Sequence, residues 1–135
     1  MRGFNKFRNI KINNATFGKF DSTLEYNTFL YLLALQQHGK ISELKRQVAI
    51  DLTPLKQKHK VKYVCDFLYK DKERGLIIAD AKGMLRPEYR VKREWLLYQY
   101  KGFVFIEFYK EQIKEYRPSG DLDLKESILE KINYK

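Results

Sequence analysis

Two β-prone runs, residues 61–69 and 76–81, limit the possible folds more than any other part of the sequence. Both are rich in branched aliphatic and aromatic residues, and the polar segment 71–75 between them ends in Gly75. This pattern predicts a β-hairpin. If the turn is centred on Glu73, residues whose numbers sum to 146 stand opposite each other, so we expect Asp66 opposite Asp80.

These two aspartates carry the chemistry that the sequence predicts. Asp66 interrupts an otherwise apolar run, and a buried carboxylate needs a charged or coordinating partner. Directly opposed strand residues share a face with Cβ atoms about 4.5–5.5 Å apart, and Lys82 falls on the face of Asp80. Two carboxylates at this spacing suit Mg²⁺, which activates water for phosphodiester hydrolysis. In the alternative interpretation, residues 80–83 form a turn and Lys82 is an ordinary surface residue; a register shift of one would also separate the aspartates.

The remaining elements can be placed by caps and hydrophobic pattern. The sequence predicts, in order, a helix from Asp21 or Ser22 to Gln37, a strand in 44–52, the hairpin, a helix from Pro87 to about Tyr100, a strand at 103–108 and a short helix at 122–132. This order, α-β-β-β-α-β-α, predicts an α/β fold with a mixed central sheet. Because residues 29–35 are almost all apolar, we expect the first helix to be buried on nearly every side.

Charge indicates the class of partner. The chain of 135 residues has a net charge of +10, and residues 1–106 hold 21 basic against 10 acidic residues. Such a surplus favours a polyanionic partner, with nucleic acid first and an anionic membrane surface second. Residues 1–20 contain no acidic residue and are interpreted as a flexible basic arm or, alternatively, as a frayed terminus. The core is expected at residues 21–108, followed by a C-terminal extension at 109–135. The single Cys and the lack of a long apolar run predict one cytoplasmic domain that does not enter a membrane.

Further candidates lie on the two main helices. Glu25 shares a helical stripe with Phe29 and Leu32 and should point inward, although residues 22–25 also read as a capping box in which Glu25 bonds back to the Ser22 amide. On the second helix, basic side chains gather on one side and could hold phosphates or form a solvated face: Arg86, Arg90, Arg93 and the adjacent Lys92. The opposite stripe of Val91, Trp95 and Tyr98 is expected to pack on the sheet.

Four short motifs over residues 17–108 resemble the PD-(D/E)xK nuclease superfamily, and more narrowly its small phage-encoded, Holliday junction resolvase-like members. They are the segments 20–25, 39–41 with 46–48, 63–67 with 80–83, and 89–92. The resemblance implies a restriction-endonuclease-like core. It implies Asp66 and Asp80 as metal ligands, Glu25 as an auxiliary ligand or orienter and Lys82 as the catalytic lysine. Gln47 and Lys92 match family positions, whereas Cys65 stands where many members have Pro.

Taken together, the residues and the resemblance predict a Mg²⁺-dependent DNA endonuclease, in which Mn²⁺ should substitute, acting on branched or junction DNA. Cutting both strands of a symmetric junction calls for two sites and therefore a homodimer. Two alternatives stay open: a nucleic-acid-binding protein that keeps a nuclease fold without catalysis, and a restriction-type enzyme that cuts plain duplex.

Overall fold

The computed structural model describes residues 12–53, 59–83 and 85–129. Its elements follow the chain as β1 (Ile12–Asn14), β2 (Gly18–Phe20), α1 (Thr23–Gln37), β3 (Ile41–Asp51), β4 (Lys62–Asp71), β5 (Gly75–Ala81), α2 (Pro87–Gln99), β6 (Tyr100–Lys101), β7 (Val104–Phe108), β8 (Ile113–Tyr116), β9 (Leu122–Asp123), a 3₁₀ turn (Leu124–Ser127) and β10 (Ile128–Leu129). Six of the strands form one sheet in the order β10-β3-β4-β5-β7-β8. The sheet is mixed, because β5 and β7 run parallel and its other neighbours are antiparallel. The predicted α/β fold with a mixed sheet is confirmed.

The hairpin of β4 and β5 has the predicted register. Phe67 pairs with Ala79 and Asp71 with Gly75, so paired numbers sum to 146. The turn is stabilised by Asp71, whose carboxylate accepts the N–H groups of Glu73 and Arg74 at 2.8 and 3.1 Å. Gly75 adopts a φ of 78°, a left-handed conformation that glycine reaches without strain.

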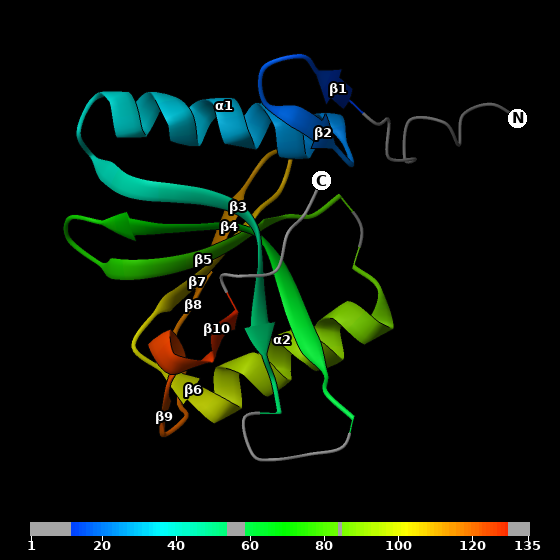
Figure 1. Ribbon diagram of the computed structural model, residues 1–135, viewed down its shortest axis with the longest axis vertical. Coiled ribbons are helices and arrows are strands. Elements are labelled where there is room, and N and C mark those ends of the chain that lie inside the picture. The colour runs from blue at the N-terminus through cyan, green and yellow to red at the C-terminus, as the bar shows by residue number, and fades with distance from the viewer. Residues whose placement is uncertain (1–11, 54–58, 84, 130–135) are drawn as a thin grey trace, which may run out of the picture.

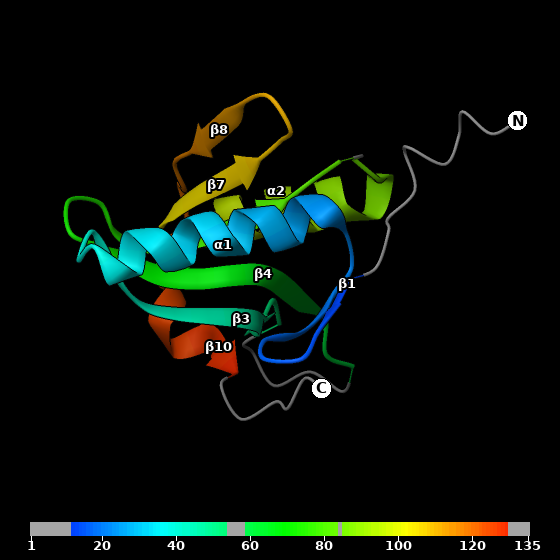
Figure 2. The ribbon, with the colours of Figure 1, turned by 90° about the horizontal axis from the view of Figure 1, so that it is seen from above.

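The two helices cover opposite faces of the sheet, as Figures 1 and 2 show. On one face, Phe29 and Leu32 of α1 pack with Ile77 and Ala79 of the sheet. On the other, α2 packs through Leu96 and Leu97 with sheet residues such as Ile78. The chain thus has a three-layer arrangement with β4 and β5 in the middle, which places the predicted acidic residues between the helices.

α1 begins and ends as predicted but is buried on only one face. Ser22 accepts the Glu25 N–H at 3.0 Å as the N-cap, and Gly39 follows the C-cap with a φ of 76°. Leu30 and Tyr31 are 39% and 51% exposed. The expectation of burial on nearly every side was wrong, because a helix lying on one face of a sheet has solvent on its other side.

α2 begins at Pro87 as predicted. Of the three residues expected to pack on the sheet, Trp95 is half-buried against the core, but the expectation was wrong for Val91 and Tyr98. Val91 and Tyr98 are 64% and 69% exposed, while Leu96 and Leu97 are buried. The buried stripe also includes Arg93, which is 8% exposed, because Glu107 of β7 lies beneath it. The charged side chain of Arg93 therefore lies on the buried side of α2, at a position where the pattern of apolar residues predicts exposure to solvent.

Both ends of the described chain differ from the prediction. Within the part of the basic arm that the structure describes, residues 12–20 form the hairpin of β1 and β2, and Phe20 is 1% exposed; residues 1–11 lie outside the described residues. The helix expected at 122–132 is wrong: residues 124–127 form a 3₁₀ turn, and Ile128 pairs with Ile50 at the edge of the sheet. Residues 130–132 of that predicted helix lie outside the described residues. None of the helices in the described ranges is long and apolar enough to cross a bilayer.

Candidate functional site

The two predicted acidic residues meet where β4 and β5 separate. The β-ladder ends at the pair of Phe67 and Ala79, one residue before Asp66 and Asp80. Beyond it, the Asp66 N–H donates to the Asp80 carboxylate at 2.8 Å, and the Ala81 N–H donates to the Asp66 carboxylate at 2.9 Å. Each carboxylate therefore bonds the backbone of the other strand. The two side chains occupy the gap that the diverging strands leave.

The aspartates do not simply share one face of the sheet, as the register argument expected. Asp80 accepts the Tyr63 hydroxyl, and Tyr63 packs in the layer of α2. Asp66 accepts the Gln47 amide at 3.3 Å on the side of α1. The carboxylates meet because the ladder has ended there and each turns toward the neighbouring backbone. The negative charge of Asp66 still raises the pKa of Asp80.

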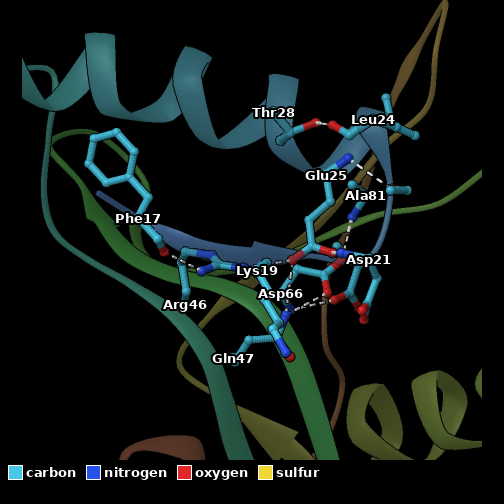
Figure 3. Close-up of polar contacts among 12 residues, drawn as sticks. Phe17, Lys19, Asp21, Leu24, Glu25, Thr28, Arg46, Gln47, Asp66 and Ala81 are labelled. Atoms are coloured by element: carbon cyan, nitrogen blue, oxygen red, sulfur yellow. Dashed lines mark hydrogen bonds and ion pairs between the residues drawn. The ribbon is translucent and has the colours of Figure 1, made fainter. Parts of the chain in front are cut away.

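Gln47 links Asp66 to the third acidic residue. Its amide nitrogen donates to Glu25 at 3.0 Å as well as to Asp66 (Figure 3). Gln47 has a φ of 53°, a left-handed conformation that is costly for a residue with a side chain. This backbone turn directs the Gln47 amide to a position between two carboxylates. Gln47 thus belongs to the acidic site, where its amide orients the carboxylates.

Glu25 is buried, and its two carboxylate oxygens have different hydrogen-bond partners. One carboxylate oxygen accepts a helix-start N–H, but from Asp21 at 3.2 Å and not from Ser22, the residue that the capping-box interpretation named. The other oxygen accepts the amide of Gln47 and the guanidinium of Arg46. The two oxygens of one carboxylate therefore serve the helix terminus and the site separately.

Arg46 is a site residue that the sequence analysis missed. Its guanidinium lies 3.6 Å from the centroid of the Phe20 ring, forms an ion pair with Glu25 at 3.3 Å and donates to the carbonyls of Phe17 and Lys19 at 3.1 and 2.6 Å. It thereby fastens the hairpin of β1 and β2 to the acidic site (Figure 3). Its Nε is buried without a hydrogen-bond partner among the described groups. The sequence signal that could have identified Arg46 as a site residue was its position directly before Gln47.

Burial makes the carboxylates hard to ionise. Desolvation, followed by the charge of Asp66, raises the pKa of Asp80 to about 7. Desolvation also raises the pKa of Asp66, and desolvation with the charge of Asp66 raises that of Glu25. The ammonium of Lys82 acts in the opposite direction on both aspartates. Burial is thus the main reason why the ionised form of all three carboxylates is disfavoured.

Lys82 is held beside the aspartates by an aromatic ring. Its Nζ lies 4.2 Å from the centroid of the Tyr89 ring, and its N–H donates to the Phe108 carbonyl at 2.9 Å. The Tyr89 hydroxyl donates to Glu107 at 2.5 Å. Glu107 is fully buried and also accepts Arg93 and the hydroxyls of two further tyrosines, Tyr109 and Tyr116. This Glu107 network fixes the surroundings of Lys82.

The basic residues of α2 do not form one surface. Arg86 and Arg90 are exposed and Lys92 is half-buried, whereas Arg93 is buried and donates to Glu107 at 2.9 Å. Arg93 cannot contact DNA from this position, because its guanidinium is committed to Glu107. The prediction of a three-arginine ridge was therefore wrong for Arg93.

The donor set suits a hard divalent cation with an open coordination shell. Within the described ranges, no group of three or more His, Cys, Asp or Glu side chains is placed to hold a metal ion. Mg²⁺, however, is commonly held by one or two carboxylates together with water and substrate phosphate. Asp66 and Asp80 offer such a pair, and a bound cation would favour the ionised form of both carboxylates, which burial disfavours. Glu25 reaches this pair through Gln47, which fits the role of orienter.

A family comparison covers most of the chain. Residues 4–117 match the model of a family described as a protein of unknown function, DUF1064, and the chain belongs to that family. Neither the curated proteins nor the solved structures give a match.

Proposed function

We propose that this DUF1064 protein is a metal-dependent DNA endonuclease that hydrolyses phosphodiester bonds, with Asp66 and Asp80 as metal ligands. One observation carries the proposal: the fully buried Asp80 and the half-buried Asp66 bond each other's strands where β4 and β5 part, with Lys82 beside them. The helix, the meander β3-β4-β5, the second helix and β7 follow the order of the nuclease core that the sequence resembles. We therefore propose a restriction-endonuclease-like core.

Each residue has a role in this proposal. A divalent cation bound by Asp66 and Asp80 would polarise the scissile phosphate and lower the pKa of an attacking water. Lys82 contributes an ammonium that offsets the negative charge growing on the phosphate. Gln47 and Glu25 hold the Asp66 carboxylate in position. Exposed Arg86 and Arg90, with Lys92, supply positive charge for the DNA backbone.

The proposed substrate is branched DNA, and cutting a symmetric junction requires two copies of this site. We therefore propose a homodimer as the active form on junctions. The net charge of +10 supports a polyanionic substrate.

The test is a cleavage assay with a labelled four-way junction, a fork and a linear duplex, in Mg²⁺, Mn²⁺ or chelator. The wild-type protein should cut branched DNA only with a divalent cation. Asp66→Asn and Asp80→Asn should each lower the rate by on the order of 100-fold or more, with DNA binding kept. Asp71→Asn is the matched control, since Asp71 lies on β4 at the turn end of the same hairpin, and it should cut like the wild type.

Other outcomes would replace the proposal. Salt-sensitive binding without cleavage under either cation would make the protein a DNA-binding factor. Cutting of plain duplex at fixed positions would make it a restriction-type enzyme. If Asp80→Asn cleaved DNA at the wild-type rate, Asp80 would have no catalytic role.

A further inference from the structure

An open groove lies between α1 and the turn that joins β7 to β8, two segments whose ribbons can be followed in Figure 2. Its volume is about 570 Å³, within the roughly 300–1,000 Å³ typical of small-molecule sites. The lining residues come from α1 (Asn27, Thr28 and Tyr31) and from the segment 108–113. We call this the aromatic groove. Its size is suited to a ligand of about one nucleotide.

The aromatic groove presents rings that are held in place. Tyr31 is 51% exposed, and its ring meets Phe108 edge to face at 6.2 Å between centroids. The Tyr109 hydroxyl donates to the fully buried Glu107 at 2.8 Å, which fixes the second tyrosine. A base can stack on a ring of this kind whatever its sequence. An exposed, oriented Tyr31 is the surface that such stacking needs.

Polar and charged groups around the rings suit a nucleotide better than an apolar peptide. Asn27 has an exposed amide, which can donate to and accept from a base edge. Lys110 is exposed on the rim, and Lys114 lies 5.3 Å from the centroid of the Tyr109 ring. Glu111 also lines the groove, so the positive charge is local to these two lysines. The amide can therefore bond a base edge, the tyrosine rings can stack on the base, and the lysines can pair with a phosphate.

The groove borders β7, the strand that pairs with β5 and so with the strand of Asp80. Phe108 pairs with Ala81 in the parallel ladder, and its carbonyl accepts the N–H of Lys82 at 2.9 Å. Glu107, which holds Tyr109, pairs with Asp80 in the same ladder. Neighbouring strands lie only about 4.8 Å apart. The groove therefore lies one strand away from Asp80, close enough for consecutive nucleotides of one DNA strand to reach both places.

We propose that the aromatic groove binds an unpaired base adjacent to the scissile phosphate, by stacking on Tyr31. The inference rests on the proposed nuclease function and narrows its substrate to DNA with a splayed or unpaired nucleotide at the cut. A fully paired duplex keeps its bases in the stack and cannot fill the groove without unstacking.

The test measures binding in chelator, so that it does not depend on cleavage. The probes are a linear duplex and a fork with 2-aminopurine at the first unpaired position. Wild-type protein should quench the 2-aminopurine fluorescence of the fork. Tyr31→Ala should abolish the quenching and weaken fork binding about tenfold or more, with less than twofold change on duplex. Tyr31→Phe, which keeps the ring, should restore both.

Tyr98→Ala is the matched control, because Tyr98 is an exposed tyrosine on α2, which covers the other face of the sheet. It should bind and quench like the wild type. Equal losses on fork and duplex, or unchanged quenching in Tyr31→Ala, would overturn the proposal. A change of oligomeric state in Tyr31→Ala, measured by sedimentation, would assign the groove to a second copy and also overturn it. Quenching without cleavage in Mg²⁺ would reject the nuclease but keep the groove, whereas cleavage without quenching would do the reverse.

Discussion

Asp80 is fully buried, and burial together with the charge of Asp66 moves its pKa from 3.8 to about 7. The folded protein therefore binds the Asp80 proton more tightly than the unfolded chain does. The stability contribution of protonated Asp80 is complete below pH 3.8 and is lost as the pH rises to about 7. At roughly 1.4 kcal/mol per pH unit, this interval corresponds to a loss of about 4 kcal/mol. Asp80→Asn keeps the shape of the side chain but has no charge to bury.

Urea unfolding of metal-free protein in chelator, followed at pH 5, 6, 7 and 8, measures this effect. The stability of Asp80→Asn minus that of the wild type should increase by about 3 kcal/mol from pH 5 to pH 8, because most of the interval lies in that range. Asp71→Asn is the control of opposite sign. Backbone and Arg74 hydrogen bonds lower the pKa of Asp71, so its removal should destabilise the protein at neutral pH and less so in acid.

A difference between Asp80→Asn and wild type that stays constant from pH 5 to pH 8 would refute the reasoning, since it would mean that Asp80 ionises normally in the folded state. Mg²⁺ provides a second measurement. At 100 times its dissociation constant a cation stabilises the wild type by roughly 2.7 kcal/mol, and it should stabilise Asp80→Asn far less.

The Glu107 network yields two further predictions. Glu107→Gln should lower the free energy of unfolding at pH 7 by about 3–5 kcal/mol, because Arg93 loses its buried counter-charge; in urea titrations the loss should shrink in acid, since Glu107 has a lowered pKa and wild type loses this contribution as the pH falls through it. Tyr89→Leu should slow junction cleavage about tenfold by freeing Lys82 from its aromatic contact, while Tyr89→Phe should retain most of the rate; equal rates for all three proteins would contradict a positioning role for the ring.

The hairpin and its acidic residues could be predicted because the signals are local. The position of Gly75 and the polar turn fix the register, and Asp66 stands out in an apolar run. The same reasoning applied to β7 would have found Glu107, the one charged residue in a strand whose five residues are all buried. What could not be predicted is which side chains meet Glu107, because its four partners come from α2, from β8 and from the turn that joins β7 to β8.

The errors arise where tertiary contacts override local pattern. Arg93 faces inward because it forms an ion pair with Glu107 of β7. The buried side of α2 is therefore turned away from Val91 and Tyr98, which are exposed. Residues 122–129 have helix-compatible composition, but Ile128 and Leu129 pair with β3 at the edge of the sheet instead of continuing a helical turn. Arg46 escaped notice because its contacts with Phe20 and Glu25 join three separate elements.

The outer strand β8 limits how two copies of the molecule can associate. Only four residues long, it has charged, exposed Lys114 and Glu115 at its centre, and Glu115 is bound on either side by Arg74 and Arg117. Short, charged borders of this kind discourage a second chain from extending the sheet. A two-fold dimer able to grip both arms of a junction would therefore be built through helices or loops in preference to a continuous intermolecular sheet at β8.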